Sequence, residues 1–240
     1  MTAPQRQVFL DVGGHRGQTL EEVLTPKWAF DVIFCFEPDP ECFAHIESIF
    51  AEAIDEERLI VINAGLSDES GDVTLYGDNS GGGASALHKH GADDTIQRTV
   101  AFLDVCAFLD RHMEDGDAIY MKLNCEGAET AILNRLAAEN RLAPFAAIMA
   151  DFDITKTKGG LMKKIAAIDA VKKRGFSNLD LSEAVMVGKT HQERIRNWLL
   201  RYPELRRTDF GTEFAGERVL PQRPSRRVKY ALRDLRSLFL

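Results

Sequence analysis

Short apolar runs alternate with longer segments of helical period along most of this chain. Five runs scarcely alternate between apolar and polar positions, which is the pattern of strands buried on both faces of a parallel sheet. Strands separated by helices in this way are typical of βαβ units. We therefore predict an α/β fold with a doubly wound, mostly parallel sheet. The expected strands are 8–12, 32–36, 59–63, 119–123 and 146–152, and the expected helices are 19–24, 40–53, 128–140 and 161–174.

Two regions depart from this rhythm. A short β-prone run at 73–76 follows Gly71 and leads into a glycine-rich segment, 77–91, that we expect to form a flexible loop. Near the end of the regular pattern, the runs 178–181 and 184–187 predict an antiparallel hairpin at one edge of the sheet.

A glycine-rich turn follows the first expected strand. A strand, a glycine turn and a helix in this order form a typical nucleotide site. A dinucleotide fingerprint, G-x-G-x-x-G, needs a glycine two residues after the first, but His15 follows Gly13 and Arg16 follows Gly14 at that spacing. A pyrophosphate ligand is therefore disfavoured. Asp11, two residues before the first glycine, is placed to accept a hydrogen bond from an amino group, or else to serve as a turn or capping aspartate. The expected ligand contacts in this turn are Asp11, Gly13, Gly14, His15 and Gly17.

Glu37 ends the second expected strand, twenty residues after Gly17. An acid at this place in such a fold hydrogen-bonds the hydroxyls of a ribose. The alternative is a solvated acid at a strand end. Because strand, turn, helix, strand and acid occur in the required order, we predict a cofactor that carries a nucleoside.

Charge divides the chain into two parts. Residues 1–188 hold 17 Lys and Arg against 31 Asp and Glu, and residues 189–240 hold 13 against 6. We predict a cofactor-binding domain, 1–188, and a basic C-terminal extension, 189–240. The acidic domain repels nucleic acid, so no nucleic-acid partner is expected. The last residues, 226–240, form a basic amphipathic helix candidate that suits either an anionic membrane surface or a protein surface.

The four cysteines are scattered without a C-x-x-C pair, and no long apolar stretch is present, so a cytoplasmic protein is expected. His88 and His90 lack further patterned ligands, and we expect no metal. The oligomeric state is left open.

Four blocks of sequence share an order and spacing: 9–17 (FLDVGGHRG), 35–40 (CFEPDP), 63–68 (NAGLSD, with Gly71 after it) and 121–129 (MKLNCEGAE). Together with the Leu103-Asp104 pair, they resemble the FkbM family of S-adenosylmethionine-dependent methyltransferases, over roughly residues 8–185. The resemblance implies a class I methyltransferase fold with a seven-stranded sheet and S-adenosylmethionine as cofactor. It also implies that Ser67 and Asp68 lie near the adenine, and that the acceptor is a hydroxyl on a sugar, a glycan or a small metabolite.

Two residues depart from the family pattern. His15 stands where the family commonly has asparagine. Asn124 stands where the motif lysine-x-aspartate-x-glutamate-glycine has its aspartate.

The end of the fourth expected strand supplies the candidates for chemistry. Glu126 is the first choice for a general base, with a stabilising charge at the start of the next helix as the alternative. Lys122 lies in an apolar strand and needs a charged partner, for which Glu126 or Glu129 is expected. Lys122 either forms a structural pair that orders the acceptor loop or takes part directly in the chemistry. Asn124 can orient an acceptor hydroxyl but cannot be a base. Asp151 and Asp153 are alternative bases or hydroxyl ligands, or else solvated acids.

Three functions from different classes are compatible with the sequence. They are an O-methyltransferase, a nicotinamide-dependent oxidoreductase, which the missing glycine spacing disfavours, and a catalytically silent cofactor-binding or scaffold protein, which Asn124 favours.

Overall fold

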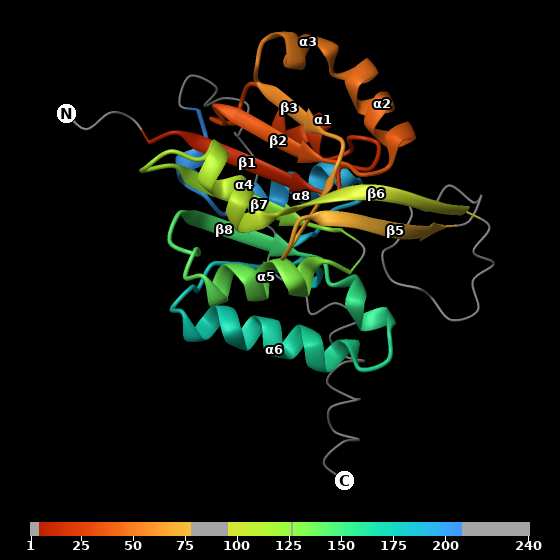
Figure 1. Ribbon diagram of the computed structural model, residues 1–240. Coiled ribbons are helices and arrows are strands. Elements are labelled where there is room, and N and C mark those ends of the chain that lie inside the picture. The colour runs from red at the N-terminus through yellow and green to blue at the C-terminus, as the bar shows by residue number, and fades with distance from the viewer. Residues whose placement is uncertain (1–4, 78–95, 126, 208–240) are drawn as a thin grey trace.

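A central sheet of six parallel strands forms the middle of the molecule (Figure 1). The computed structural model describes residues 5–77, 96–125 and 127–207. The expected parallel α/β architecture is confirmed, with six strands in this sheet among the described residues instead of seven. In spatial order the strands are β3 (Leu59–Ile62), β2 (Val32–Phe36), β1 (Gln7–Val12), β7 (Ala118–Leu123), β8 (Phe145–Ala150) and β9 (Leu179–Leu181).

Strand β1 lies in the middle of the sheet, paired with β2 on one side and β7 on the other. Its side chains alternate between the faces, so that Val8, Leu10 and Val12 join one core and Phe9 joins the other. Asp11 points to the same face as Phe9, and the register places it beside Lys122 of β7.

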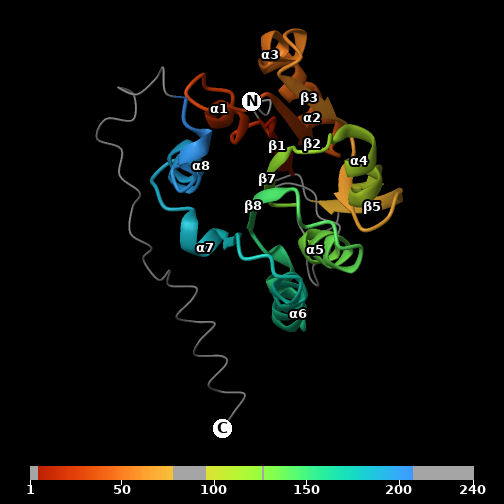
Figure 2. The same ribbon diagram turned by 90° about the vertical axis from the view of Figure 1, so that its left-hand side faces the viewer.

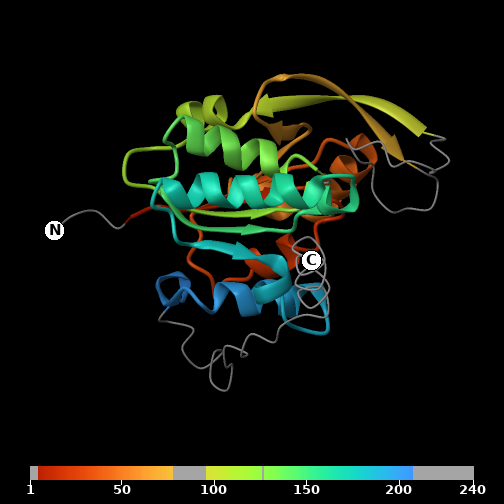
Figure 3. The same cartoon turned by 90° about the horizontal axis from the view of Figure 1, so that it is seen from below.

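Helices cover both faces of the sheet (Figures 2 and 3). One face is covered by α4, α5 and α6, and the other by α1 and α8. This two-sided packing explains why the strands are apolar almost throughout. The helices are α1 (Leu20–Val23), α2 (Pro40–Ile49), α3 (Ala51–Asp55), α4 (Val105–His112), α5 (Glu129–Ala138), α6 (Gly160–Lys173), α7 (Ser182–Val185) and α8 (His191–Leu199), with 3-10 turns η1 (Asp153–Lys156) and η2 (Pro203–Leu205).

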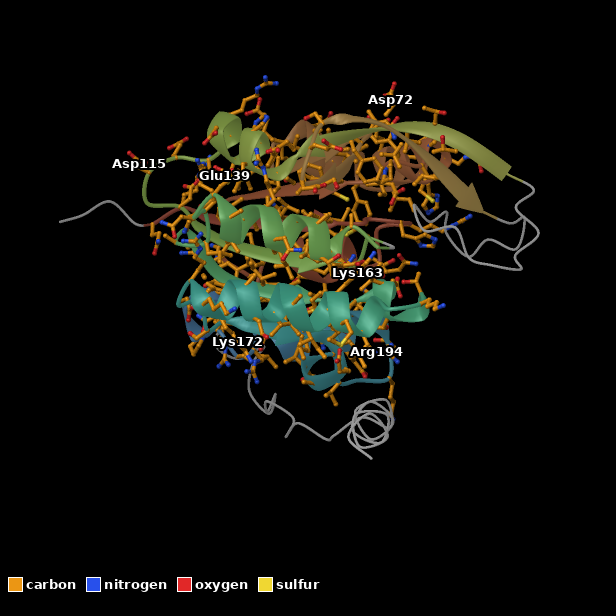
Figure 4. All side chains as sticks on the ribbon, turned by 60° about the horizontal axis from the view of Figure 1, so that its bottom comes forward. Asp72, Asp115, Glu139, Lys163, Lys172 and Arg194 are labelled. Carbon is orange, nitrogen blue, oxygen red and sulfur yellow. The ribbon has the colours of Figure 1, made fainter. Side chains whose placement is uncertain are left out.

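The outward surfaces of these helices carry charge. Figure 4 shows Lys163, Lys172 and Arg194 on the exterior, where water solvates them. Among the described residues, no helix combines the length and the apolar character needed to cross a lipid bilayer.

A second sheet of three strands joins β4 (Gly65–Ser67), β6 (Ile96–Asp104) and β5 (Gly71–Gly77) in that order. The β-prone run at 73–76 is therefore confirmed as part of β5, whose antiparallel partner β6 was not predicted. The β5–β6 pair projects beyond the carboxyl ends of the central strands (Figure 1). Most of the expected glycine-rich loop, 78–91, lies outside the described residues.

The prediction of an antiparallel hairpin at 178–187 is wrong. β9 runs parallel to β8, as expected for a strand that follows the α6 crossover. The next segment folds as α7, in which Ser182 and Val185 are buried three residues apart. Runs of three or four residues are too short for periodicity to separate a strand from a helix.

Helix α8 packs on α1, although the sequence assigns it to the C-terminal extension (Figure 2). Trp198 is fully buried against Phe9. The buried carboxylate of Glu22 in α1 accepts a hydrogen bond from Trp28 Nε1 and forms ion pairs with Lys27 and Arg196. Residues 191–207 therefore complete the core on this face. The expected basic helix, 226–240, lies outside the described residues.

Candidate functional site

The glycine turn follows β1 in the chain and is hydrogen-bonded to the carboxyl end of β2. The backbone N–H groups of Gly13 and Gly14 both donate to the carbonyl oxygen of Phe36, at 3.1 and 3.0 Å, and Gly17 N–H donates to Gly14 O at 2.8 Å. The carboxyl ends of parallel strands are where ligands bind in doubly wound sheets. The turn therefore has both the position and the tight backbone geometry of a nucleotide-binding turn.

Gly13 is needed for close packing as well as for its conformation. Its φ is +89°, and a Cβ atom there would lie 1.9 Å from the carbonyl oxygen of Asn124. Gly14 and Gly17 are also tight, but against side chains, since added Cβ atoms would lie 2.3 Å from Cys35 Sγ and 2.4 Å from the Phe50 ring. Only glycine fits at these positions without a shift of the neighbouring backbone or side-chain atoms.

His15 adopts a left-handed backbone conformation, with φ of 49°. Asn, Asp and His are the non-glycine residues found most often in this region. The replacement of the family's asparagine by histidine is therefore compatible with the backbone of this turn.

Glu37 is bound to the turn. Its Oε2 accepts the His15 N–H at 2.5 Å, and its Oε1 accepts the Asp39 N–H at 2.8 Å. The side chain is only 6% exposed, so the alternative of a solvated acid is wrong. Burial raises the pKa of Glu37 to about 7, although the two backbone hydrogen bonds favour the carboxylate.

Asp11 lies beneath the turn and forms a buried ion pair with Lys122. Lys122 Nζ is 2.9 Å from Asp11 Oδ1 and donates a hydrogen bond to Gly13 O at 2.7 Å. Asp11 is completely buried, and burial raises the pKa of its carboxyl, an effect that the Lys122 ammonium opposes. Of the two partners expected for Lys122, Glu126 lies outside the described residues and Glu129 is wrong, because β7 places Lys122 beside Asp11 of β1. Asp11 caps no helix, and its contact with a ligand stays a prediction.

The segment after β7 lies against the glycine turn. Asn124 is half-buried, and its N–H donates to Val12 O at 3.0 Å. Oε1 of the fully buried Glu129 accepts the N–H groups of Cys125 and Gly127, at 3.0 and 3.2 Å. Glu129 therefore holds the residues on both sides of Glu126, which itself lies outside the described residues.

Glu129 gives the fold a pH dependence that a single substitution tests. Burial raises its pKa from 4.5 to about 7, and the nearby Asp153 adds to the rise. The stability from this raised pKa is complete below about pH 4.5 and is lost as the pH rises through about 7. In Glu129→Gln, the amide oxygen still accepts both N–H groups, and no charge develops. The unfolding free energy of the variant should therefore rise relative to wild type between about pH 5 and about pH 8.5.

Guanidinium denaturation at the two pH values measures this difference. Glu139→Gln is the control, because Glu139 is exposed at the other end of α5. A constant difference between Glu129→Gln and wild type at both pH values contradicts the prediction.

The remaining predicted residues are placed as follows. Ser67 ends β4 in the second sheet, and its hydroxyl donates to Asp68 Oδ1 at 3.0 Å. Asp151 follows β8 and is half-buried, whereas Asp153 is buried, so the alternative of a solvated acid is wrong for Asp153. His88 and His90 lie outside the described residues. Within the described part, no three His, Cys, Asp or Glu residues gather in a group suited to a metal ion.

His191, the first residue of α8, was not among the predicted site residues. Its Nε2 shares a hydrogen bond with Thr19 Oγ1 at 3.0 Å, directly after the glycine turn. The two residues are 172 positions apart. His191 lies in the segment 189–240, which the change in charge predicts to be an extension, and no local motif marks it as a site residue.

The residues present fit a nucleoside-bearing cofactor. Each Glu37 oxygen accepts one backbone N–H and keeps further lone-pair capacity for a ribose hydroxyl. Gly13, Gly14 and Gly17 have no side chains that would keep a ligand away from the backbone of the turn. Asp11 fits less directly, because its carboxylate is buried against Lys122. Its effect on a ligand would act through Lys122, which donates to Gly13 O in the turn.

Comparison with known proteins gives one family match and one structural match. Residues 11–201 match the family described as Methyltransferase FkbM domain. A crystal structure of Methyltransferase FkbM from Methylobacillus flagellatus KT is similar at 16% sequence identity and a TM-score of 0.44. That match covers 70% of this chain and 37% of the other, so this chain spans little more than a third of its length. No functionally curated protein matches this chain.

Proposed function

Because the chain belongs to the FkbM methyltransferase family, we propose that it transfers a methyl group from S-adenosylmethionine to a hydroxyl of a sugar, a glycan or a small metabolite. The main support is the hydrogen bond that joins Glu37 to the glycine turn through His15 N–H. This bond brings a ribose-binding acid and a nucleotide-binding turn into one site.

In the proposed complex, Glu37 binds the ribose hydroxyls, and the turn from Gly13 to Gly17 lies against the rest of the cofactor. Lys122 supports the turn from below through Gly13 O, and Asp11 keeps Lys122 in place. The bound cofactor supplies a sulfonium methyl group, which is electrophilic without further activation. The protein then has to align the acceptor oxygen with that methyl group, at roughly 3 to 3.5 Å.

The segment after β7 is the proposed acceptor side. Asn124 orients the acceptor hydroxyl through its amide, and Glu126 takes its proton as general base. Glu129 fixes the backbone on both sides of Glu126. Ser67 and Asp68 are proposed to lie near the adenine, as the family resemblance implies.

A catalytically silent cofactor-binding protein is the second candidate, and Asn124 favours it, because the family's aspartate is absent. Incubation with radiolabelled S-adenosylmethionine and a panel of sugars and glycans separates the two. Labelled product supports the enzyme, and cofactor binding without any product supports the silent protein.

Glu37→Gln tests the cofactor assignment. We expect wild type to bind S-adenosylhomocysteine, and the variant to bind it roughly tenfold to a hundredfold more weakly, because a hydrogen bond to a charged group contributes about 1.5 to 3 kcal/mol. Isothermal titration calorimetry measures both dissociation constants.

Glu41→Gln is the control, because Glu41 lies four residues away on α2 and is exposed. NAD is the control ligand. Wild type that binds NAD but not S-adenosylhomocysteine contradicts the proposed function, and equal affinity in wild type and Glu37→Gln contradicts the role of Glu37.

A further inference from the structure

The start of α8 lies against the start of α1, behind the glycine turn. His191 Nε2 and Thr19 Oγ1 share a hydrogen bond of 3.0 Å. One helical turn further on, Arg196 Nη2 forms a 2.9 Å ion pair with the buried Glu22 of α1. The two helices lie side by side (Figure 2) and are connected by these two polar contacts, of which the contact of His191 involves the residue closer in sequence to the glycine turn.

Thr19 connects the turn to α1. Its carbonyl oxygen accepts the N–H groups of Glu22 and Val23, and the preceding Gly17 O accepts the N–H of Glu21. The Thr19 side chain does not cap α1, although threonine is a common capping residue. Thr19 is only 2% exposed, and its hydroxyl bonds His191 instead, so His191 determines how this residue is held.

A second connection runs through Lys122. Burial lowers the pKa of His191 to about 4, and the positive charges of Lys122 and Arg194 add to this effect. His191 is therefore neutral at physiological pH. Lys122 in turn donates to Gly13 O, at the beginning of the glycine turn. His191 thus lies near the supports of both ends of the turn, Gly13 and Thr19.

We propose that His191 is a positioning residue for the cofactor. Its hydrogen bond to Thr19 fixes the start of α1, so that the glycine turn keeps the shape that binds S-adenosylmethionine. This inference rests on the proposed function, since it concerns the same cofactor. It assigns to α8 a part in cofactor affinity, beyond its part in the core.

Calorimetric titration with S-adenosylhomocysteine tests this role without an acceptor substrate. His191→Ala should bind about fivefold to tenfold more weakly than wild type, the effect of one buried hydrogen bond. His191→Gln should restore most of the affinity, because a glutamine amide places a hydrogen-bonding group close to the position of Nε2. A residue needed only to fill space is not expected to show this recovery.

Thr19→Val and the double variant complete the test. Thr19→Val should weaken binding as His191→Ala does, and the double variant should bind no more weakly than either single variant, because both remove the same bond. Lys172→Ala is the control, since Lys172 is exposed on α6 (Figure 4) and should leave the affinity unchanged.

The outcomes separate this inference from the proposed function. Wild type that does not bind S-adenosylhomocysteine overturns both. Wild type that binds, together with His191→Ala of equal affinity, overturns only the role of His191. The same holds if His191→Gln binds as weakly as His191→Ala, or if the losses in the double variant simply add.

Discussion

Lys122→Met is expected to lower the free energy of unfolding by about 3 to 5 kcal/mol, the usual effect of removing one partner from a buried ion pair. Asp11 is completely buried and pairs with Lys122. Removing the Lys122 ammonium therefore leaves the carboxylate charge of Asp11 uncompensated and shielded from water. Gly13 O also loses the donor that holds it at 2.7 Å. Urea denaturation at neutral pH measures the loss.

The pH dependence and a double variant identify the cause of this loss. Without Lys122, the pKa of Asp11 should rise further, because burial remains and the attraction disappears. A raised carboxyl pKa stabilises the fold at low pH, so the loss in Lys122→Met should be smaller at about pH 5 than at about pH 8. Asp11→Asn combined with Lys122→Met should recover part of the stability. An equal loss at both pH values, and no recovery in the double variant, contradicts an electrostatic cause.

Gly13→Ala is expected to destabilise the fold by roughly 2 to 6 kcal/mol, because two costs combine. A non-glycine residue held at positive φ costs about 1 to 3 kcal/mol, and forcing an extra methyl group into a packed site costs about 1 to 3 kcal/mol more. The added Cβ would lie 1.9 Å from Asn124 O, so β1 and the segment after β7 have to separate. Binding of S-adenosylhomocysteine should be lost as well.

Gly116→Ala is a matched control. Gly116 has φ of +93°, close to that of Gly13, but a Cβ there would meet nothing within 4 Å. Its cost is therefore that of the backbone alone. Guanidinium denaturation of both variants gives the cost of the collision by difference. Equal destabilisation in the two variants contradicts the close approach of Asn124 to the turn.

Residues that interact with near neighbours in the chain were predictable. The apolar runs gave the central strands, and the order of strand, glycine turn, helix and strand gave the position of Glu37 relative to the turn. The family resemblance is confirmed by the match over residues 11–201. These features depend on local sequence and on the common geometry of βαβ units.

Contacts between distant segments were not predictable in the same way. Lys122 pairs with Asp11 because β7 lies beside β1 in a particular register, and no local pattern states which strands are neighbours. His191 reaches Thr19 because α8 packs on α1, after a change in composition that suggested a separate extension. β6 was not predicted because its first residues include the polar Gln97 and Arg98, so the segment lacks the apolar run of the central strands.

The pairing of residues 27–29 with residues 205–207 affects how the protein is made. Ala29 N–H donates to Leu205 O at 2.8 Å, Arg207 N–H donates to Lys27 O at 3.1 Å, and Trp28 forms a β-bridge with Arg206. A ribosome that adds about 5 to 20 residues per second needs roughly 10 to 40 s to synthesise the intervening chain. The pairing cannot form before residue 207 has been synthesised, so the strand-like contact at Trp28 is completed long after Trp28 itself has been made.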